Sequence, residues 1–253
     1  MLRSLAFDNV SNITGVIERV VQEMIFLTSL RFNGASCGER MAMDMLATLS
    51  GLRSLCYLPR DGLQESTADA MRISHLTQLT GLTTLLYNKQ IPFCNQTTLI
   101  ELDILVSVQL DLSDAISRLT LLETLKVVNR QQCCLETPSV LRNLRHLKST
   151  TLEMPNDIGG DFFPALASLP ALTFLQFNCR NHEDSVPFLS EIALVKNLKT
   201  LSVEHVVTAH PLRFLQRGSL PRLRSLRIQP FPDLKVTRKE LHRRFPCLAS
   251  ITP

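Results

Sequence analysis

Cysteines and histidines are the side chains of this sequence best suited to nucleophilic or metal chemistry. The chain has seven cysteines and six histidines among 253 residues, and a metal site or a catalytic pair needs several such residues at a short, defined spacing. No CxxC, HxxxH or HExxH spacing occurs, and adjacent Cys133 and Cys134 are a poor disulfide pair. Neither GxGxxG nor a phosphate-binding loop is present. We therefore expect no enzyme, no metal, no cofactor and no small-molecule substrate.

Positive charge is concentrated near the C-terminal end. Residues 211–253 carry ten lysines and arginines against Asp233 and Glu240, whereas the whole chain has a net charge of +4. Such a segment could be solvated surface, could contact an acidic protein, or could contact nucleic acid through phosphates. Its few phenylalanines occupy core-like positions, so aromatic rings for base stacking are missing. The candidate basic residues are Arg213, Arg217, Arg222, Arg224, Arg227, Arg243 and Arg244.

The elements that must position these side chains follow from a recurring leucine pattern. The stretch LPRLRSLRI at 220–228 has leucines at three-residue steps, followed by a two-residue step to Ile228. Neither a helix nor a strand alone gives both steps, but a turn of the form LxxL followed by a strand of the form LxL does. Related stretches recur from LRSLAF at 2–7 to FPCLASI at 245–251, which predicts a strand in every unit.

The apolar residue that opens each predicted strand recurs about every 25 residues, a period typical of a solenoid. The frame is ambiguous at 76–105, where Leu82 and Leu85 both fit, and irregular at 141–154. The positions taken to open the strands are Leu5, Leu30, Leu55, Leu85, Leu102, Leu125, Leu152, Leu175, Leu201, Leu226 and Ile251.

The pattern resembles that of the leucine-rich repeat family, LxxLxLxxN/CxL in units of 20 to 29 residues. Helical spacing separates the strands, as at Leu112, Ala115, Ile116 and Leu119. With helices on the outer side, the units look most like the ribonuclease-inhibitor-like branch of the family. The resemblance implies an α/β horseshoe of about ten repeats, with a parallel sheet on its concave side and helices on its convex side. We expect a single domain over 1–253 that lacks complete terminal caps.

Residues that alternate with the buried strand positions should face the concave, solvent side of such a sheet. The position before the strand leucine is serine or threonine in eight of ten units, which fits either a strand-edge preference or a shared hydrogen-bonding floor. Leu58, Leu86 and Leu105 indicate either an exposed apolar patch or an error of frame. The position after the strand leucine gives the candidate partner surface: Arg31, Cys56, Leu86, Asp103, Lys126, Glu153, Gln176, Ser202 and Arg227.

The family resemblance implies a non-catalytic scaffold that binds a protein partner on its concave face. Two alternatives stay open: the substrate-recognition component of a ubiquitin ligase, a role that this branch often has, and nucleic-acid association through the basic C-terminal segment. The N-terminus MLRSLAFDNV lacks a signal-peptide pattern, and no apolar run is long enough to span a membrane. Together with an odd number of cysteines, this favours an intracellular, cytoplasmic protein.

Overall fold

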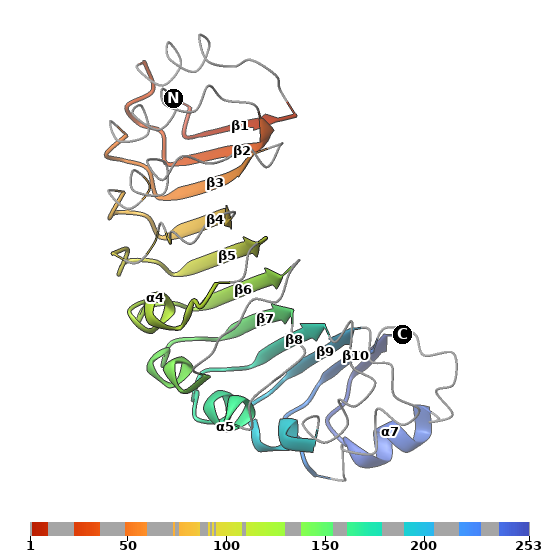
Figure 1. Cartoon of the computed structure of the whole chain (residues 1–253). Helices are drawn as coiled ribbons and strands as arrows, with labels where there is room; N and C mark the ends of the chain where they lie inside the picture. The colour runs from red at the N-terminus through yellow and green to blue at the C-terminus, as the bar shows by residue number, and fades with distance from the viewer. Residues whose placement is uncertain are drawn as a thin grey trace.

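Eleven parallel strands form one sheet in the computed structural model, which describes residues 2–9, 23–35, 49–59, 73, 76–86, 91, 93, 95–107, 110–129, 138–153, 161–178, 190–204, 218–228 and 238–252. The order of the strands in the sheet is their order along the chain. Figure 1 shows them side by side along a curved band. They are β1 (Ser4–Asp8), β2 (Ser29–Ala35), β3 (Ser54–Pro59), β4 (Gly81–Leu86), β5 (Glu101–Val106), β6 (Thr124–Asn129), β7 (Ser149–Glu153), β8 (Phe174–Asn178), β9 (Thr200–Glu204), β10 (Ser225–Ile228) and β11 (Ser250–Thr252).

The strands are entered through tight turns between buried apolar residues. The amide of Leu223 donates a hydrogen bond to the carbonyl of Leu220 at 3.2 Å, and Leu122 makes the same bond to Leu119 at 3.0 Å. A bond that spans three residues closes a turn, which explains the three-residue step. The strand that follows explains the two-residue step, so the predicted origin of the pattern is confirmed.

In β4 the register corrects the predicted frame. Leu55 of β3 pairs with Leu82 of β4, so Leu85 is not the residue that opens the strand. The reason is the preceding turn, in which the amide of Leu79 bonds to the carbonyl of Leu76 at 3.0 Å. This turn fixes Leu82 as the next inward residue, which is the second of the two frames that the sequence allows.

In β7 the predicted frame is wrong because a threonine occupies the leucine position. Leu125 of β6 pairs with Thr150, and Leu152 lies at the next inward position. The turn before β7 is regular, with Leu147 bonded to Leu144 at 2.9 Å. Threonine at this leucine position therefore leaves the backbone of the repeat regular, and only the leucine pattern of the sequence is broken.

Replacing Thr150 by valine is expected to stabilise the protein by about 1 kcal/mol. Thr150 is 1% exposed, and its hydroxyl has no hydrogen-bond partner in the part of the chain that the structure describes. Valine keeps the shape and removes the cost of an unpaired buried hydroxyl. Urea unfolding measures the change, and the same substitution at half-buried Thr151 is the control. A loss of stability in Thr150→Val would contradict the register.

The core is continuous along the sheet. Inward strand residues and the leucines of the turns form one apolar cluster from Leu27 to Leu248. Each repeat covers the apolar face of its neighbour, so stability comes from repeat-to-repeat contact rather than from a central globule.

Short helices cover the outer side of the band, where Figure 1 shows α4 (Ser113–Ser117), α5 (Phe162–Ala167) and α7 (Arg238–Arg244). Two 3-10 helices, η1 (Pro138–Asn143) and η2 (Ser190–Leu194), precede β7 and β9. The helical spacing predicted around α4 is confirmed, because Leu112, Ala115, Ile116 and Leu119 are all buried.

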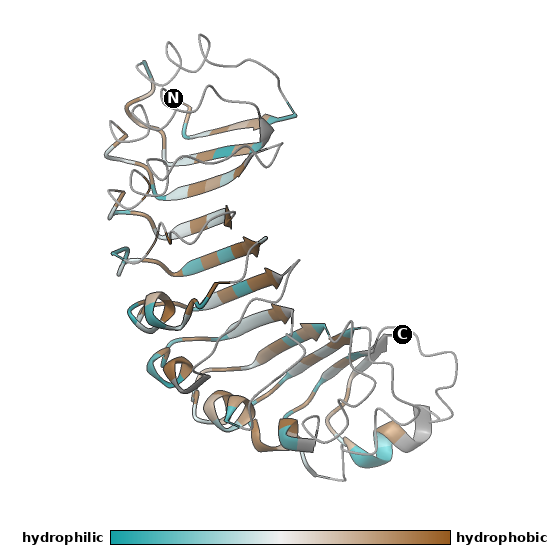
Figure 2. Ribbon diagram, in the orientation of Figure 1, coloured by the Kyte–Doolittle hydropathy of each residue, from teal (hydrophilic) through white to brown (hydrophobic). Residues whose placement is uncertain are grey.

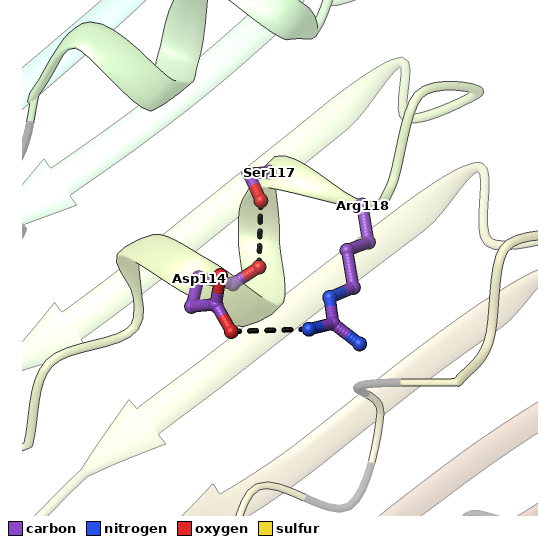
Figure 3. Close-up of polar contacts among 3 residues, drawn as sticks. All are labelled: Asp114, Ser117 and Arg118. Atoms are coloured by element: carbon purple, nitrogen blue, oxygen red, sulfur yellow. Dashed lines mark hydrogen bonds and ion pairs between the residues drawn. The ribbon is translucent and has the colours of Figure 1, made fainter.

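Polar contacts support the single turn of α4 on its exposed face. Arg118 pairs with Asp114 at 3.2 Å, and the Ser117 hydroxyl donates to the Asp114 carbonyl at 2.7 Å (Figure 3). Such exposed pairs contribute little to stability, so α4 depends mainly on its buried residues.

Candidate functional site: the concave face

The inner, concave face of the sheet presents the strand residues that alternate with the core. In β5, for example, Leu102, Ile104 and Val106 are buried while Asp103 and Leu105 are partly exposed. Figure 2 shows the corresponding alternation of hydrophilic and hydrophobic bands along the strands. We call the strand positions that alternate with the core, on the concave side of the sheet, outward positions. The register aligns one outward position of each strand in a central row: Ala6, Arg31, Cys56, Thr83, Asp103, Lys126, Thr151, Gln176, Ser202, Arg227 and Thr252.

Two predicted members of the partner surface are not in the central row. Leu86 is 3% exposed and pairs with buried Val106, so it belongs to the core. Glu153 pairs with Asn178, one outward position further along its strand. Both corrections follow from the frame shifts in β4 and β7, and Thr83 and Thr151 take the two places.

The row before the strand leucines is rich in hydroxyl groups, as predicted. The register replaces Thr84 and Thr151 in this row with Gly81 and Ser149. Ser250 donates to the Ser225 hydroxyl at 2.9 Å, which joins β11 to β10. At this end of the row, two hydroxyl groups therefore bond to each other across adjacent strands.

Ion pairs join adjacent strands at two places on the concave face. Lys126 Nζ lies 2.8 Å from Asp103 Oδ2, with the two side chains 44% and 29% exposed. Arg31 Nε lies 3.4 Å from Asp8 Oδ1, and both side chains are about half exposed. Cross-strand pairs of opposite charge fix the side chains on the face, which gives a partner a pre-ordered polar surface.

Cys56 lies between these ion pairs, with Arg31 as one of its neighbours in the central row. Burial raises the pKa of the Cys56 thiol above its ordinary value; Arg31 lowers it, and Asp103 and Asp8 add to the rise. At neutral pH the thiol therefore stays protonated, and only the thiolate is a strong nucleophile.

Polar groups on β8 and β9 are more enclosed than alternation predicts. Gln176 Nε2 donates to Glu204 Oε1 at 2.9 Å. Ser202, although it is an outward residue, is 4% exposed, and its hydroxyl has no partner within the described ranges. Alternation along the strand predicts that Ser202 is exposed to solvent on the concave face. This prediction is wrong, because Ser202 is buried.

An apolar row lies beside the central row, one outward position further along the strands. Leu85 pairs with Leu105, and Leu105 pairs with Val128; Leu58 follows Tyr57, the last β3 residue paired with β4. Leu58, Leu105 and Val128 are half-buried, and Leu85 is 8% exposed. The sequence indicates Leu58 and Leu105 but misses Leu85 and Val128. Extending the alternation two residues beyond Lys126 would have found Val128, whereas the predicted frame of β4 places Leu85 at the inward, strand-opening position. We call Leu58, Leu85, Leu105 and Val128 the apolar row.

Five of the seven candidate basic residues lie in the part of the chain that the structure describes. Arg213 and Arg217 lie outside the described residues. Arg222 and Arg224 lie in the turn and strand entry before β10, Arg227 is an outward residue of β10, and Arg243 and Arg244 belong to α7. The five described residues thus belong to three parts of the fold, and a shared basic surface stays a prediction.

Within the described ranges, no group of three or more His, Cys, Asp or Glu side chains is placed to hold a metal ion. No helix in that part of the chain is both long and apolar enough to cross a membrane.

The parallel strands, the leucine turns and the continuous core define a leucine-rich repeat solenoid. The chain is similar in fold to an internalin (inlF) from Listeria monocytogenes, with a TM-score of 0.50, 19% sequence identity, and 89% of this chain and 73% of that chain covered. It also matches an internalin C2 (inlC2) from the same organism at a TM-score of 0.46 and 22% identity, with 83% of each chain covered. No family model and no curated protein matches the sequence. These comparisons bear on the fold alone.

Proposed function

We propose that the chain is a non-catalytic scaffold that binds a protein partner on its concave face. The observation that carries this proposal is the apolar row on β3 to β6, which lies beside the Lys126–Asp103 ion pair of the central row. Protein interfaces combine an apolar centre with a polar surround, and the concave face offers this combination over β3 to β6. The protonated Cys56 thiol fits a binding surface better than a nucleophilic site.

Leu105→Glu is expected to remove partner binding with little effect on folding. Leu105 is half-buried at the centre of the apolar row, and a charge placed in an interface centre weakens binding by about tenfold or more. The measurement is affinity capture from the native cell, followed by identification of the proteins held by the wild type and lost from the variant.

Leu2→Glu provides the matched control, because Leu2 is 49% exposed and lies outside the strands. The proposal requires proteins that the wild type and Leu2→Glu retain and Leu105→Glu loses. Capture of the same proteins by all three chains would refute it. Recovery of a ubiquitin-ligase adaptor among the lost proteins would favour the recognition component as the particular scaffold.

An intracellular, cytoplasmic location belongs to the same proposal. Cys56 and Cys247 are free thiols, which fits a reducing compartment. Fluorescence microscopy of the tagged chain in its native cell tests the location.

We further propose one domain over residues 1–253, of the ribonuclease-inhibitor-like branch. Its support is the unbroken order of β1 to β11 and the helices α4, α5 and α7 on the outer side. A single calorimetric unfolding transition would support one domain, and two separated transitions would contradict it.

A further inference from the structure

A second surface lies at the edge of the sheet where the strands begin. The residue just before each strand donates its amide to the carbonyl of the corresponding residue one repeat earlier: Thr173 to Lys148 at 2.9 Å, Lys199 to Thr173 at 2.8 Å and Arg224 to Lys199 at 2.8 Å. This ladder keeps successive edge residues about 4.8 Å apart, the spacing of strands in a sheet.

Cations gather along this edge over the C-terminal half of the sheet. The entries to β7, β9 and β10 each carry two basic residues, two or three positions apart. All six of these side chains are exposed. We call this set the basic edge; it consists of Arg145, Lys148, Lys196, Lys199, Arg222 and Arg224.

Most of these charges have no anionic partner among the residues that the structure describes. Lys148 pairs with Glu123 at 2.7 Å, whereas Lys196 donates to the Ser219 carbonyl at 3.0 Å and Arg222 to the Asn197 amide oxygen at 3.2 Å. Among the described residues, no carboxylate forms an ion pair with the other five side chains of the basic edge. Arg118 on the outer side, by contrast, is paired within its own helix (Figure 3). Within the described part of the chain, the basic edge therefore has positive charge that no carboxylate pairs with.

Exposed aliphatic side chains continue the same edge. Glu123, the neighbour of Lys148 in the ladder, donates its amide to the carbonyl of Ile100 at 2.8 Å. Ile100 is 38% exposed, and Leu121 in the turn before β6 is 49% exposed. The edge thus combines an apolar end with a basic stretch.

We infer that the basic edge, together with Ile100 and Leu121, binds an acidic protein segment that carries aliphatic side chains. Carboxylates would meet the unpaired cations, and aliphatic residues would cover Ile100 and Leu121. A nucleic-acid backbone would use only the charges. Among the described exposed large hydrophobic residues, the one aromatic is Phe26, at the opposite end of the sheet, so base stacking has no platform near the basic edge.

This surface is separate from the one proposed for the concave face. Lys199 of the basic edge lies just before the first residue of β9. Leu105 of the apolar row is the fifth residue of β5, near the opposite end of its strand. A partner on the concave face and an acidic segment on the edge can therefore bind independently.

The test uses the full chain and a labelled synthetic peptide of glutamate and leucine, titrated by fluorescence anisotropy across a salt series. Polyglutamate, single-stranded DNA and duplex DNA of matched length are the competitors. We expect the glutamate and leucine peptide to bind most tightly and its affinity to fall as salt rises. The double variant Lys199→Glu with Arg224→Glu should weaken it by about tenfold or more.

The control reverses the same amount of charge at equivalent ladder positions elsewhere. Arg3 and Arg53 precede β1 and β3, and their backbone carbonyls accept hydrogen bonds from the amides of Thr28 and Thr80. Because these two side chains lie outside the basic edge, Arg3→Glu with Arg53→Glu should leave the peptide affinity within about twofold. If the glutamate variant of the basic edge does not fold by circular dichroism, Lys199→Gln with Arg224→Gln takes its place. Absent peptide binding, tighter binding of DNA, equal binding of polyglutamate, or an equal loss in the control pair would each overturn the inference.

Discussion

Replacing Leu201 by aspartate is expected to unfold the C-terminal repeats. Leu201 is fully buried and pairs with Leu175 on one side and Leu226 on the other. An aspartate there would be a charge without a partner between two stacked repeats, at a cost of several kcal/mol. A typical domain is stable by about 5 to 15 kcal/mol, so the loss should remove cooperative folding of β8, β9 and β10. Urea unfolding and hydrogen exchange over these strands measure it.

Neighbouring residues on the same strand provide the controls. Thr200→Asp changes a half-buried outward residue and should alter stability by no more than about 0.5 kcal/mol. Ser202→Asp should also be harmful, because Ser202 is 4% exposed despite its outward position. If Leu201→Asp were no more harmful than Thr200→Asp, the inward direction of Leu201 would be wrong.

The repeat architecture could be predicted because its cause is local. A turn closed by one hydrogen bond and a short strand together impose the leucine spacing, as at Leu220 and Leu223. Prediction failed where a residue type broke that link. At Thr150 the backbone keeps the repeat but the side chain does not, and in β4 several leucines satisfy the same pattern.

The exposure of individual surface residues could not be predicted in the same way. Alternation along a strand says which face a side chain takes, and it is correct for Asp103 and Lys126. It does not say what encloses that face, which is why Ser202 appears exposed in the pattern and is buried in the fold.

The basic edge shows another limit of linear reasoning. The charge count points to residues 211–253, whereas the fold places Arg224 beside Lys199, a repeat earlier. A usable signal did exist: the residue that follows the second leucine of each turn is basic in several repeats, including Lys148, Lys199 and Arg224. Reading the sequence by repeat position would have found the edge.

Outer and inner surfaces of the solenoid depend on the same strands. Side chains of α5 pack on the inward residues of β8, while the outward residues of β8 form part of the concave face. A packing defect on the outer side should therefore disturb the concave face even though it touches no outward residue.

Phe163→Ala is the strongest test of this dependence. Phe163 in α5 is 1% exposed, and its ring meets Phe177 of β8 edge-on at a centroid distance of 6.3 Å and Phe162 at 5.3 Å. Truncating a buried phenylalanine to alanine costs about 3 to 5 kcal/mol through lost burial and a cavity.

We expect a matching fall in the free energy of unfolding and loss of hydrogen-exchange protection in β8, where Gln176 faces the concave side. Phe26→Ala is the control, because Phe26 is 51% exposed and its truncation should change stability by no more than about 0.5 kcal/mol. Equal losses in Phe163→Ala and Phe26→Ala would show that α5 does not hold β8 in place. A large loss that leaves β8 protected would show that the two surfaces are independent.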